Sequence, residues 1–321
     1  MRLAMVKEMT RARFLSAIEG RLVADPLKVF IKREPHKLSK LTEGRYRLIS
    51  AVSLVDALVD RILLGELCRN ILKPTNIMRT PCAIGWAPNK GGWRYISLTY
   101  ENGLSIDRKA WDWTVAEWLV RIWERFLIEM HPNAPRWWLL GLSTRFTALF
   151  YSAQFSFPDG MIVQQAAPGI MKSGCLMTLI LNSVGQTALH FLASIRSGLD
   201  PNLNIPLSMG DDTLQHPFAE MEEYASRLAE LAVVKEAEHT EGYSEFIGFL
   251  FDKKGFFPAY WKKHLFNLRH LDPRVSHDVL VQYQYLWYRH PSMLRHIRDI
   301  CWKSDPTAIV PDIVLRDNAD G

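Results

Sequence analysis

Hydrophobic residues recur at helical spacing in three long stretches of the chain. The spacing predicts amphipathic helices over residues 53–72, 115–130 and 221–234. Short apolar or alternating runs bounded by turn residues predict strands over residues 47–52, 103–107, 205–209, 213–215 and 245–251. Helices and strands interleave without a regular alternation, which favours an α+β fold over a doubly wound sheet.

Composition places the 321-residue chain among globular proteins, with 48% hydrophobic and 23% charged residues. The four cysteines are far apart and match no zinc spacing, so we expect reduced thiols in a cytosolic setting. The most apolar segment, residues 175–195, is interrupted by Asn182, Gln186 and His190, which argues against a membrane span.

The net charge of +5 is unevenly distributed. Residues 1–50 hold 12 Lys or Arg against 5 Asp or Glu, whereas the remainder holds 27 basic against 29 acidic residues. A basic N-terminal region suits a polyanion such as nucleic acid or nucleotide phosphate. A solvated basic surface fits equally well, so charge alone leaves both interpretations open.

Three carboxylates are candidates for a metal site. The stretch "IPLSMGDDTLQHP" predicts strand, tight turn and strand, with Asp211 and Asp212 at the tip after Gly210. Asp107 ends another predicted strand and would lie beside this tip if the two strands are neighbours. Converging carboxylates repel one another unless cations bind, and two-metal sites for phosphoryl transfer use such clusters. The alternatives are an ordinary surface hairpin and an acid near a helix start.

Two polar segments complete the candidate chemistry. In "GIMKSGCLMTLILN", Ser173 and Gly174 predict a loop before a helix, and Thr178 and Asn182 share one helix face, as ligands or as hydrogen-bonded core residues. In "VFIKREPHKLSKLTEGRYRLISAV", basic residues bracket a turn that leads into an apolar strand. On an extended strand Arg45 and Arg47 would point the same way and could fork onto phosphate oxygens. A solvated loop is the alternative.

Taken in this order, the four elements resemble the RNA-directed RNA polymerases of positive-strand RNA viruses. The patterns are K-x-E…K…G-[KR]-x-R-[LI]-I in the basic segment, D-x4-D at Asp107 and Asp112, S-G-x3-T-x3-N, and G-D-D. The resemblance runs from about Phe30 to Phe251 and is strongest to the sobemovirus and luteovirus-like enzymes.

The resemblance implies a right-hand fold with a small antiparallel palm sheet flanked by helices. Fingers would be residues 1–100 and 113–172, palm 101–112 and 173–251, and thumb 252–321. Asp107 and Asp211 would hold two Mg²⁺ ions, which Mn²⁺ could replace, and Asp212 would support them. The remaining implied site residues are Lys32, Lys40, Arg45 and Arg47 at the triphosphate, Ser173 and Gly174 under the template and nascent pair, and Asp112, Asn182 and Thr178 at the ribose.

Lys235 is our candidate for the acid that protonates pyrophosphate, with an exposed lysine ending a helix as the alternative. The implied reaction is RNA synthesis from ribonucleoside triphosphates on an RNA template. The implied setting is the host-cell cytoplasm, at membrane-associated sites reached through other replication proteins. Only 31 residues precede the basic loop, which predicts reduced fingertips or origin from a longer polyprotein. A reverse transcriptase and a non-catalytic RNA-binding scaffold are the competing hypotheses.

Overall fold

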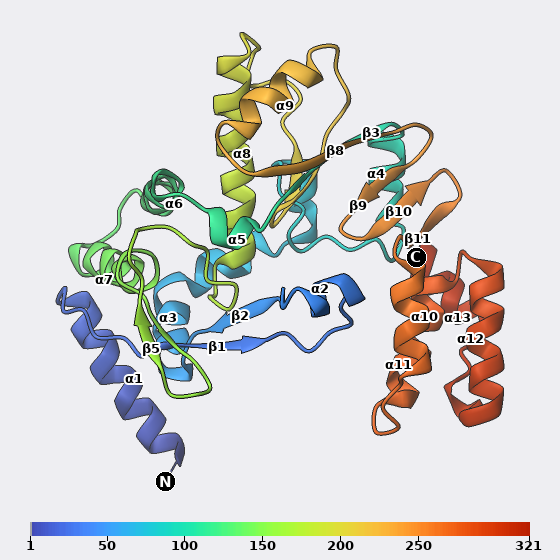
Figure 1. The fold of residues 1–321 in the computed structure, drawn as a ribbon, viewed down its shortest axis with the longest axis horizontal. Coiled ribbons are helices and arrows are strands. Elements are labelled where there is room, and N and C mark those ends of the chain that lie inside the picture. The colour runs from blue at the N-terminus through green and yellow to red at the C-terminus, as the bar shows by residue number, and fades with distance from the viewer. Residues whose placement is uncertain (1) are drawn as a thin grey trace.

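The computed structural model describes residues 2–321, apart from the side chain of residue 236, and it combines helices with small sheets (Figure 1). The helices are α1 (Arg2–Ile18), α2 (Leu38–Thr42), α3 (Leu54–Ile71), α4 (Trp93–Thr99), α5 (Trp111–Thr114), α6 (Glu117–Glu129), α7 (Arg136–Phe146), α8 (Thr178–Arg196), α9 (Met221–Ala229), α10 (Trp261–Arg269), α11 (Ser276–Trp287), α12 (Pro291–Ser304) and α13 (Asp312–Asp320), with short helical turns η1 (Pro74–Met78), η2 (Thr147–Tyr151) and η3 (Pro306–Ala308). The strands are β1 (Leu27–Ile31), β2 (Leu48–Ala51), β3 (Gly103–Arg108), β4 (Gln154–Ser156), β5 (Ile162–Gln164), β6 (Leu207–Met209), β7 (Asp212–Leu214), β8 (Val234–Thr240), β9 (Ser244–Phe246), β10 (Phe249–Asp252) and β11 (Gly255–Pro258).

The strands form several small sheets. One has the order β2-β1-β4-β5, with β1 parallel to β4 and the other neighbours antiparallel. β3 pairs antiparallel with β8, and β6 and β7 form a hairpin. A bridge between Leu104 and Gln215 joins the end of the hairpin to β3, so β7 and β8 flank β3 on opposite edges. β9, β10 and β11 form an antiparallel meander.

Buried apolar side chains gather in separate clusters. The largest is built from α3, α6, α7 and α8 against β1 and β3, with Trp123 at its centre. Another lies between α4 and the β9–β11 meander. A further one is formed by α10 to α12 around Trp287, in the group of C-terminal helices at the right of Figure 1. In the described residues, no helix is both long and apolar enough to cross a membrane.

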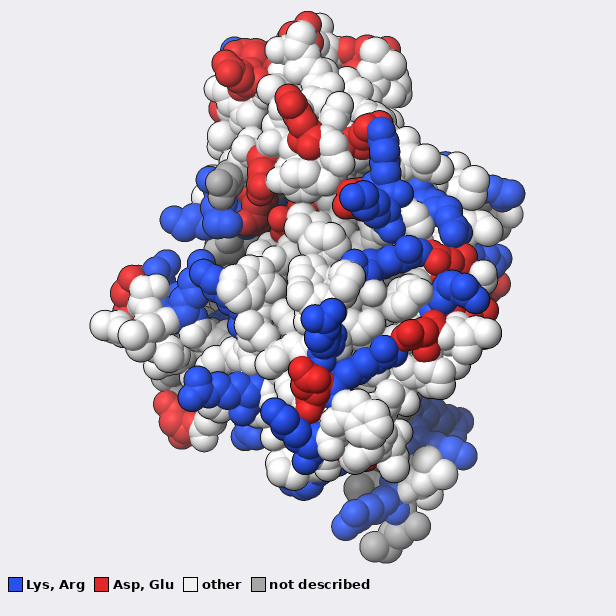
Figure 2. All heavy atoms as spheres, turned by 90° about the vertical axis from the view of Figure 1, so that its right-hand side faces the viewer, with Lys and Arg blue, Asp and Glu red and all other residues white. Residues whose placement is uncertain are grey.

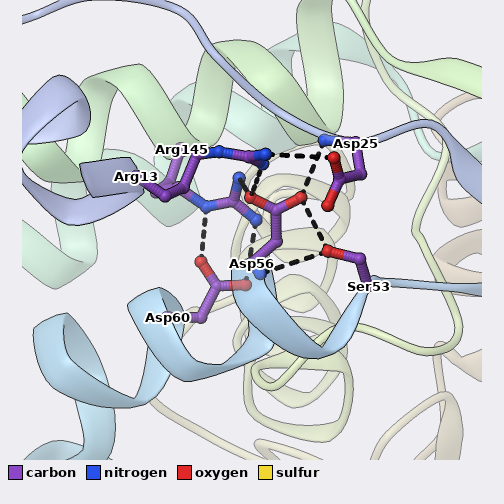
Figure 3. A network of polar contacts seen from close by, with 6 residues as sticks. All are labelled: Arg13, Asp25, Ser53, Asp56, Asp60 and Arg145. Carbon is purple, nitrogen blue, oxygen red and sulfur yellow. Dashed lines mark hydrogen bonds and ion pairs between the residues drawn. The ribbon is translucent and has the colours of Figure 1, made fainter. Parts of the chain in front are cut away.

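A buried ion network ties α1 to α3 and α7 (Figure 3). Arg145 on α7 donates from Nε to Asp60 Oδ1 at 2.6 Å and from Nη1 to Asp56 Oδ1 at 3.1 Å. Arg13 on α1 donates to the same Asp56 oxygen at 2.7 Å, and Ser53 caps α3 through the Asp56 N–H. Asp56 therefore holds the N-terminal helix against α3 and α7, and Asp60 holds α7 against α3.

Two predicted elements differ from the structure. The predicted helix over 221–234 ends at Ala229, because the β-branched residues that follow enter β8 and pair with β3. The predicted strand over 245–251 is two strands, β9 and β10. Ile247 and Gly248 both have positive φ, +47° and +77°, and make the two-residue turn between them.

Charged side chains are unevenly spread over the face of the C-terminal helices. Figure 2 shows Lys and Arg over the middle and lower parts of this face, whereas Asp and Glu gather toward its upper end. The net positive excess still lies in residues 1–50, because the remainder of the chain holds 27 basic against 29 acidic residues.

Candidate active site

The β6–β7 hairpin presents its acidic pair on a two-residue turn. Gly210 has a φ of +71°, a left-handed conformation that glycine adopts without strain. Its N–H donates to Ser183 Oγ on α8 at 2.9 Å, which fixes the turn to the helix. Met209 pairs with Asp212 at the end of the ladder. Asp211 thus lies in the turn and Asp212 begins β7, as the sequence predicts.

β3 brings Asp107 to the neighbourhood of this turn. Thr213 on β7 donates from Oγ1 to the Ile106 carbonyl at 3.3 Å, so the residue before Asp107 contacts the hairpin. On the opposite edge of β3, β8 carries Lys235, whose Nζ lies 2.6 Å from Asp107 Oδ2. Lys235 lies on a strand and not at the end of a helix, so that part of the alternative is wrong, whereas the side chain is exposed as the alternative predicts.

The surroundings of Asp211 and Asp212 disfavour the charged forms of their carboxylates. Their side chains reach the surface, yet the surrounding protein excludes part of the water around them, and this desolvation raises the pKa of Asp211 and raises that of Asp212 to about 6. The charge of Asp107 raises both pKa values further, and Asp211 adds to the effect at Asp212. Arg47 acts in the opposite direction on both, and Arg108 on Asp211. Asp107, Asp211 and Asp212 therefore act as one cluster.

The donor chemistry of this cluster fits a divalent cation. Within the described residues, no group of three or more His, Cys, Asp or Glu side chains is spaced to hold a metal ion. Asp107, Asp211 and Asp212 nevertheless offer hard carboxylate oxygens that repel one another. The ammonium of Lys235 compensates one negative charge at Asp107. The charges of Asp211 and Asp212 would have to be compensated by other cations, such as a divalent metal ion.

Asp112 and Asn182 form a polar pair next to the cluster. Asn182 Nδ2 on α8 donates to Asp112 Oδ1 at 3.5 Å. The Asn182 side chain is 3% exposed, and its Oδ1 is buried without a hydrogen-bond partner among the described residues. Desolvation, followed by the charge of Asp211, raises the pKa of Asp112 to about 6. The pair thus offers a carboxylate and an unused carboxamide oxygen to a hydroxyl group.

The Ser173–Gly174 loop contacts β2. The Gly174 N–H donates to the Ser50 carbonyl at 3.0 Å, and the Ser50 N–H donates to Ser173 Oγ at 3.4 Å. A Cβ on Gly174 would lie 2.5 Å from the Ser50 carbonyl oxygen, so only glycine permits this approach. Thr178 Oγ1 bonds the carbonyls of Lys172 and Cys175, each at 2.9 Å. Thr178 therefore closes the loop onto the start of α8.

Part of the basic segment converges on Glu34. Its carboxylate, 17% exposed, receives Lys32 Nζ at 3.1 Å and Arg47 Nη1 at 3.7 Å, and Lys263 Nζ on α10 lies 4.0 Å away. These cations lower the pKa of Glu34, although desolvation opposes them as the largest single effect. Arg47 also acts electrostatically on Asp112 and the hairpin pair, so it faces the candidate site.

The other predicted basic residues lie differently. Arg45 and Arg47 precede β2 and do not lie on it, so the strand argument for a shared direction does not apply to them. Arg45 pairs with Glu43 after the end of α2, and Lys40 lies on α2. Gly44 and the turn at the end of α2 redirect the backbone between Lys40 and Arg45. The structure thus brings Lys32 and Arg47 together at Glu34, whereas Arg45 pairs with Glu43.

Sequence reasoning missed several residues of this neighbourhood. Glu34 had a signal, because it lies two positions after Lys32 in the basic segment. The sequence also held a signal for Arg108, because side chains alternate along a strand and the residue after Asp107 therefore points to the opposite face of the sheet. Arg108 is 6% exposed, and desolvation lowers its pKa to about 10. Lys263 gave no sequence signal, because its contact joins segments more than 200 positions apart.

Comparisons with known proteins agree with this arrangement. The fold superposes on the "Sicinivirus 3Dpol RNA dependent RNA polymerase" with a TM-score of 0.69, at 17% identity and with 95% of this chain and 69% of that chain covered. Fold and site together define a right-hand nucleic-acid polymerase, which confirms the predicted fold class. Residues 26–232 match the family model "Viral RNA-dependent RNA polymerase", and the chain belongs to this family.

The sequence relatives come from the virus groups that the motifs indicate. An RNA-directed RNA polymerase of Mushroom bacilliform virus is 30% identical over 287 residues, covering 84% of this chain and 66% of the relative. The replicase polyprotein P2AB of Cocksfoot mottle virus is 30% identical over 203 residues, and protein P1-P2 of Potato leafroll virus is 27% identical over 236 residues. The alignments cover 60% and 67% of this chain, but only 20% and 21% of those two proteins.

Proposed function

We propose that this chain synthesises RNA from ribonucleoside triphosphates on an RNA template, by nucleotidyl transfer at two divalent metal ions. The observation that carries the proposal is the position of Asp107 on a strand beside the Asp211–Asp212 turn. Asp107 and Asp211 would hold the ions, preferably Mg²⁺, with Asp212 in support. When bound, the ions lower the pKa of the attacking 3′-hydroxyl and neutralise charge on the leaving pyrophosphate.

The protein side chains then bind and orient the nucleotide. Arg47 and Lys32 exchange Glu34 for the triphosphate oxygens, and Lys40 and Arg45 add positive charge along the same segment. The ribose 2′-hydroxyl donates a hydrogen bond either to the Asp112 carboxylate or to Asn182 Oδ1, which has no other hydrogen-bond partner among the described residues. Lys235 leaves Asp107 and gives a proton to the departing pyrophosphate.

The right-hand division supports this assignment. We propose that α10 to α13 form the thumb, since the apolar side chains of α10 to α12 pack in a cluster of their own and α13 contacts α11. The basic side chains over this face suit a nucleic-acid backbone (Figure 2). The polyprotein names of the relatives support a product that works with other viral replication proteins. We further propose that it acts in the host cytoplasm, at membrane-associated sites reached through those proteins.

The competing hypotheses fit less well. A reverse transcriptase would select against the 2′-hydroxyl, whereas the Asp112–Asn182 pair offers it hydrogen-bond partners. A silent RNA-binding scaffold has no need for the three clustered carboxylates. The family match favours RNA synthesis over both alternatives.

The test is elongation of a primed homopolymeric RNA template with labelled ribonucleotide and Mg²⁺. Asp211→Asn removes one charge at nearly constant shape, so we expect the fold to persist and turnover to fall about 10³-fold. Asp278→Asn, on the exposed surface of α11, is the matched control and should elongate normally. Normal elongation by Asp211→Asn would refute the metal assignment, and an inactive wild-type protein would refute the proposed function.

A further inference from the structure

Lys172 is a buried lysine in the loop between β5 and α8. It is 0% exposed, although lysine is among the residues least often buried. Its Nζ donates to Gln165 Oε1 at 2.6 Å, to the Gly169 carbonyl at 3.1 Å and to the Ile170 carbonyl at 2.7 Å. All three acceptors belong to the same loop, so the ammonium ties the loop to itself.

The environment of this ammonium is uncharged. The rings of Phe150 on η2 and Phe155 on β4 each have their centroid 5.5 Å from Nζ. Among the described residues no carboxylate forms a salt bridge with it, and the titratable group that acts on it is the buried Cys175 thiol of the same loop. Burial lowers the pKa of Lys172 to about 7. Enclosing a charge in this way costs free energy, which the three hydrogen bonds and two ring faces offset.

The loop that the ammonium braces has an unusual backbone. Gly169 has a φ of +121° and Ile170 a φ of +56°, and the latter is strained for a β-branched residue. A Cβ on Gly169 would lie 2.3 Å from the Val115 carbonyl oxygen. The two residues with these backbone angles are those whose carbonyls Lys172 binds.

The braced loop also holds two parts of the candidate site. The Met171 N–H donates to the Asp112 carbonyl at 2.7 Å, and the Gly174 N–H donates to the Ser50 carbonyl at 3.0 Å. Lys172 lies between these two anchors. A shift of its backbone therefore moves Asp112, which faces Asn182, together with the loop that contacts β2.

We propose that Lys172 is a positioning residue for nucleotide selection, whose Nζ fixes the 165–174 loop and, through it, Asp112 and the Ser173–Gly174 turn. The inference rests on the proposed polymerase function for its activity readout, but its structural readout is independent of activity. Lys172→Met keeps the length of the side chain and removes the three donors. Lys303→Met, on the exposed surface of α12, removes the same charge and is the control.

Hydrogen exchange on the metal-free protein tests the brace directly. In Lys172→Met we expect amides of residues 165–174 and 111–115 to exchange at least about tenfold faster, with exchange in α10 to α13 unchanged. Gln165→Leu, which removes one acceptor of Lys172 together with the amide that donates to the Phe150, Ala167 and Gly169 carbonyls, should show the same pattern. Unchanged exchange over residues 165–174, or faster exchange throughout the chain, would overturn the proposal.

A pH series on wild-type protein serves if the variants do not fold. Because burial lowers the pKa of Lys172 to about 7, the closed loop loses the proton above pH 7, whereas an opened loop keeps it on a solvated amine. Opening of the loop therefore becomes less favourable, and its exchange, corrected for its intrinsic pH dependence, should slow between pH 6 and pH 8.5. An exchange rate of the loop that does not change over this range would refute the brace.

The activity arm follows the same logic. Lys172→Met should lower discrimination between ribonucleotides and deoxyribonucleotides and raise the nucleotide KM about tenfold. The defect relative to wild type should grow as the pH rises from 6 to 8.5, because loss of the buried charge stabilises the closed loop of the wild type. A defect that is constant with pH would mean that the lysine serves only as packing. Failure of wild-type protein to make RNA would refute the polymerase function and leave the exchange result standing.

Discussion

The ion network of α1, α3 and α7 makes a quantitative prediction about stability. Arg145→Met removes the guanidinium that donates to Asp60 at 2.6 and 3.2 Å and to Asp56 at 3.1 Å. Asp56 keeps Arg13 and Ser53 as partners, but Asp60, which is 3% exposed, is left as a buried carboxylate without its cation. Breaking such a pair costs about 3–5 kcal/mol, so we expect a loss of that size in the free energy of unfolding.

A double-mutant cycle separates the pair from its surroundings. Asp60→Leu leaves Arg145 paired with Asp56 and should cost about 1–3 kcal/mol. The combination Asp60→Leu with Arg145→Met removes both charges and should be less destabilised than Arg145→Met alone. Arg121→Ala, which breaks an exposed pair with Glu117 on α6, is the control and should leave the free energy of unfolding nearly unchanged.

Urea unfolding followed by tryptophan fluorescence and circular dichroism measures these differences. For m of about 3 kcal/mol/M, the Arg145→Met midpoint should fall by about 1 M or more. Additivity of the two single changes would refute the reasoning, because the guanidinium and the carboxylate would then contribute independently. An Arg145→Met protein as stable as the Arg121→Ala control would refute it as well.

The remaining predictions concern nucleotide binding. Arg47→Ala should raise the nucleotide KM about tenfold and lower kcat, since it removes a guanidinium near the site. If a kinetic titration shows an unchanged dependence on nucleotide concentration, the basic segment is a solvated surface that does not bind nucleotide. Asn182→Ala should lose preference for ribonucleotides over deoxyribonucleotides when the two compete on one RNA template, and an unaltered preference would contradict the ribose assignment. Because the pKa of Asp112 is raised to about 6, its carboxylate takes up a proton as the pH falls through that value and loses its charged acceptor. Ribonucleotide preference should therefore decline below pH 6 in wild-type protein and stay constant with pH in Asp112→Asn, and competition assays between pH 5 and pH 8 measure both.

The β6–β7 hairpin was predictable because its signals are local. A glycine followed by two aspartates between short apolar runs predicts a tight turn, and the structure has that turn at Gly210–Asp211. The neighbourhood of Asp107 followed from a single assumption about strand order, which the bridge to Gln215 confirms. The family prediction, made on the order of four motifs, is confirmed by the match over residues 26–232.

What the sequence did not reveal depends on contacts between distant segments. Lys172 gives the same signal as any surface lysine, and only the fold encloses it between Phe150 and Phe155. Glu34 and Lys263 meet because α10 packs near the basic segment, which no local pattern records. The roles of the site residues and the boundaries of fingers, palm and thumb stay predictions for the experiments above.

The short parallel bridge between Ala51 and Gly174 has a mechanical consequence. It connects the strand that begins just after Arg47 to the loop that begins just after Lys172, and it does so through main-chain atoms. A displacement at Arg47 would reach Ser173 and Gly174 along peptide groups, whose stiffness is insensitive to side-chain identity. If the proposed function holds, surface substitutions in the basic segment would alter how tightly a nucleotide is bound without altering this backbone connection. Uncoupling the two sides requires a change that the backbone itself feels, such as a Cβ at Gly174.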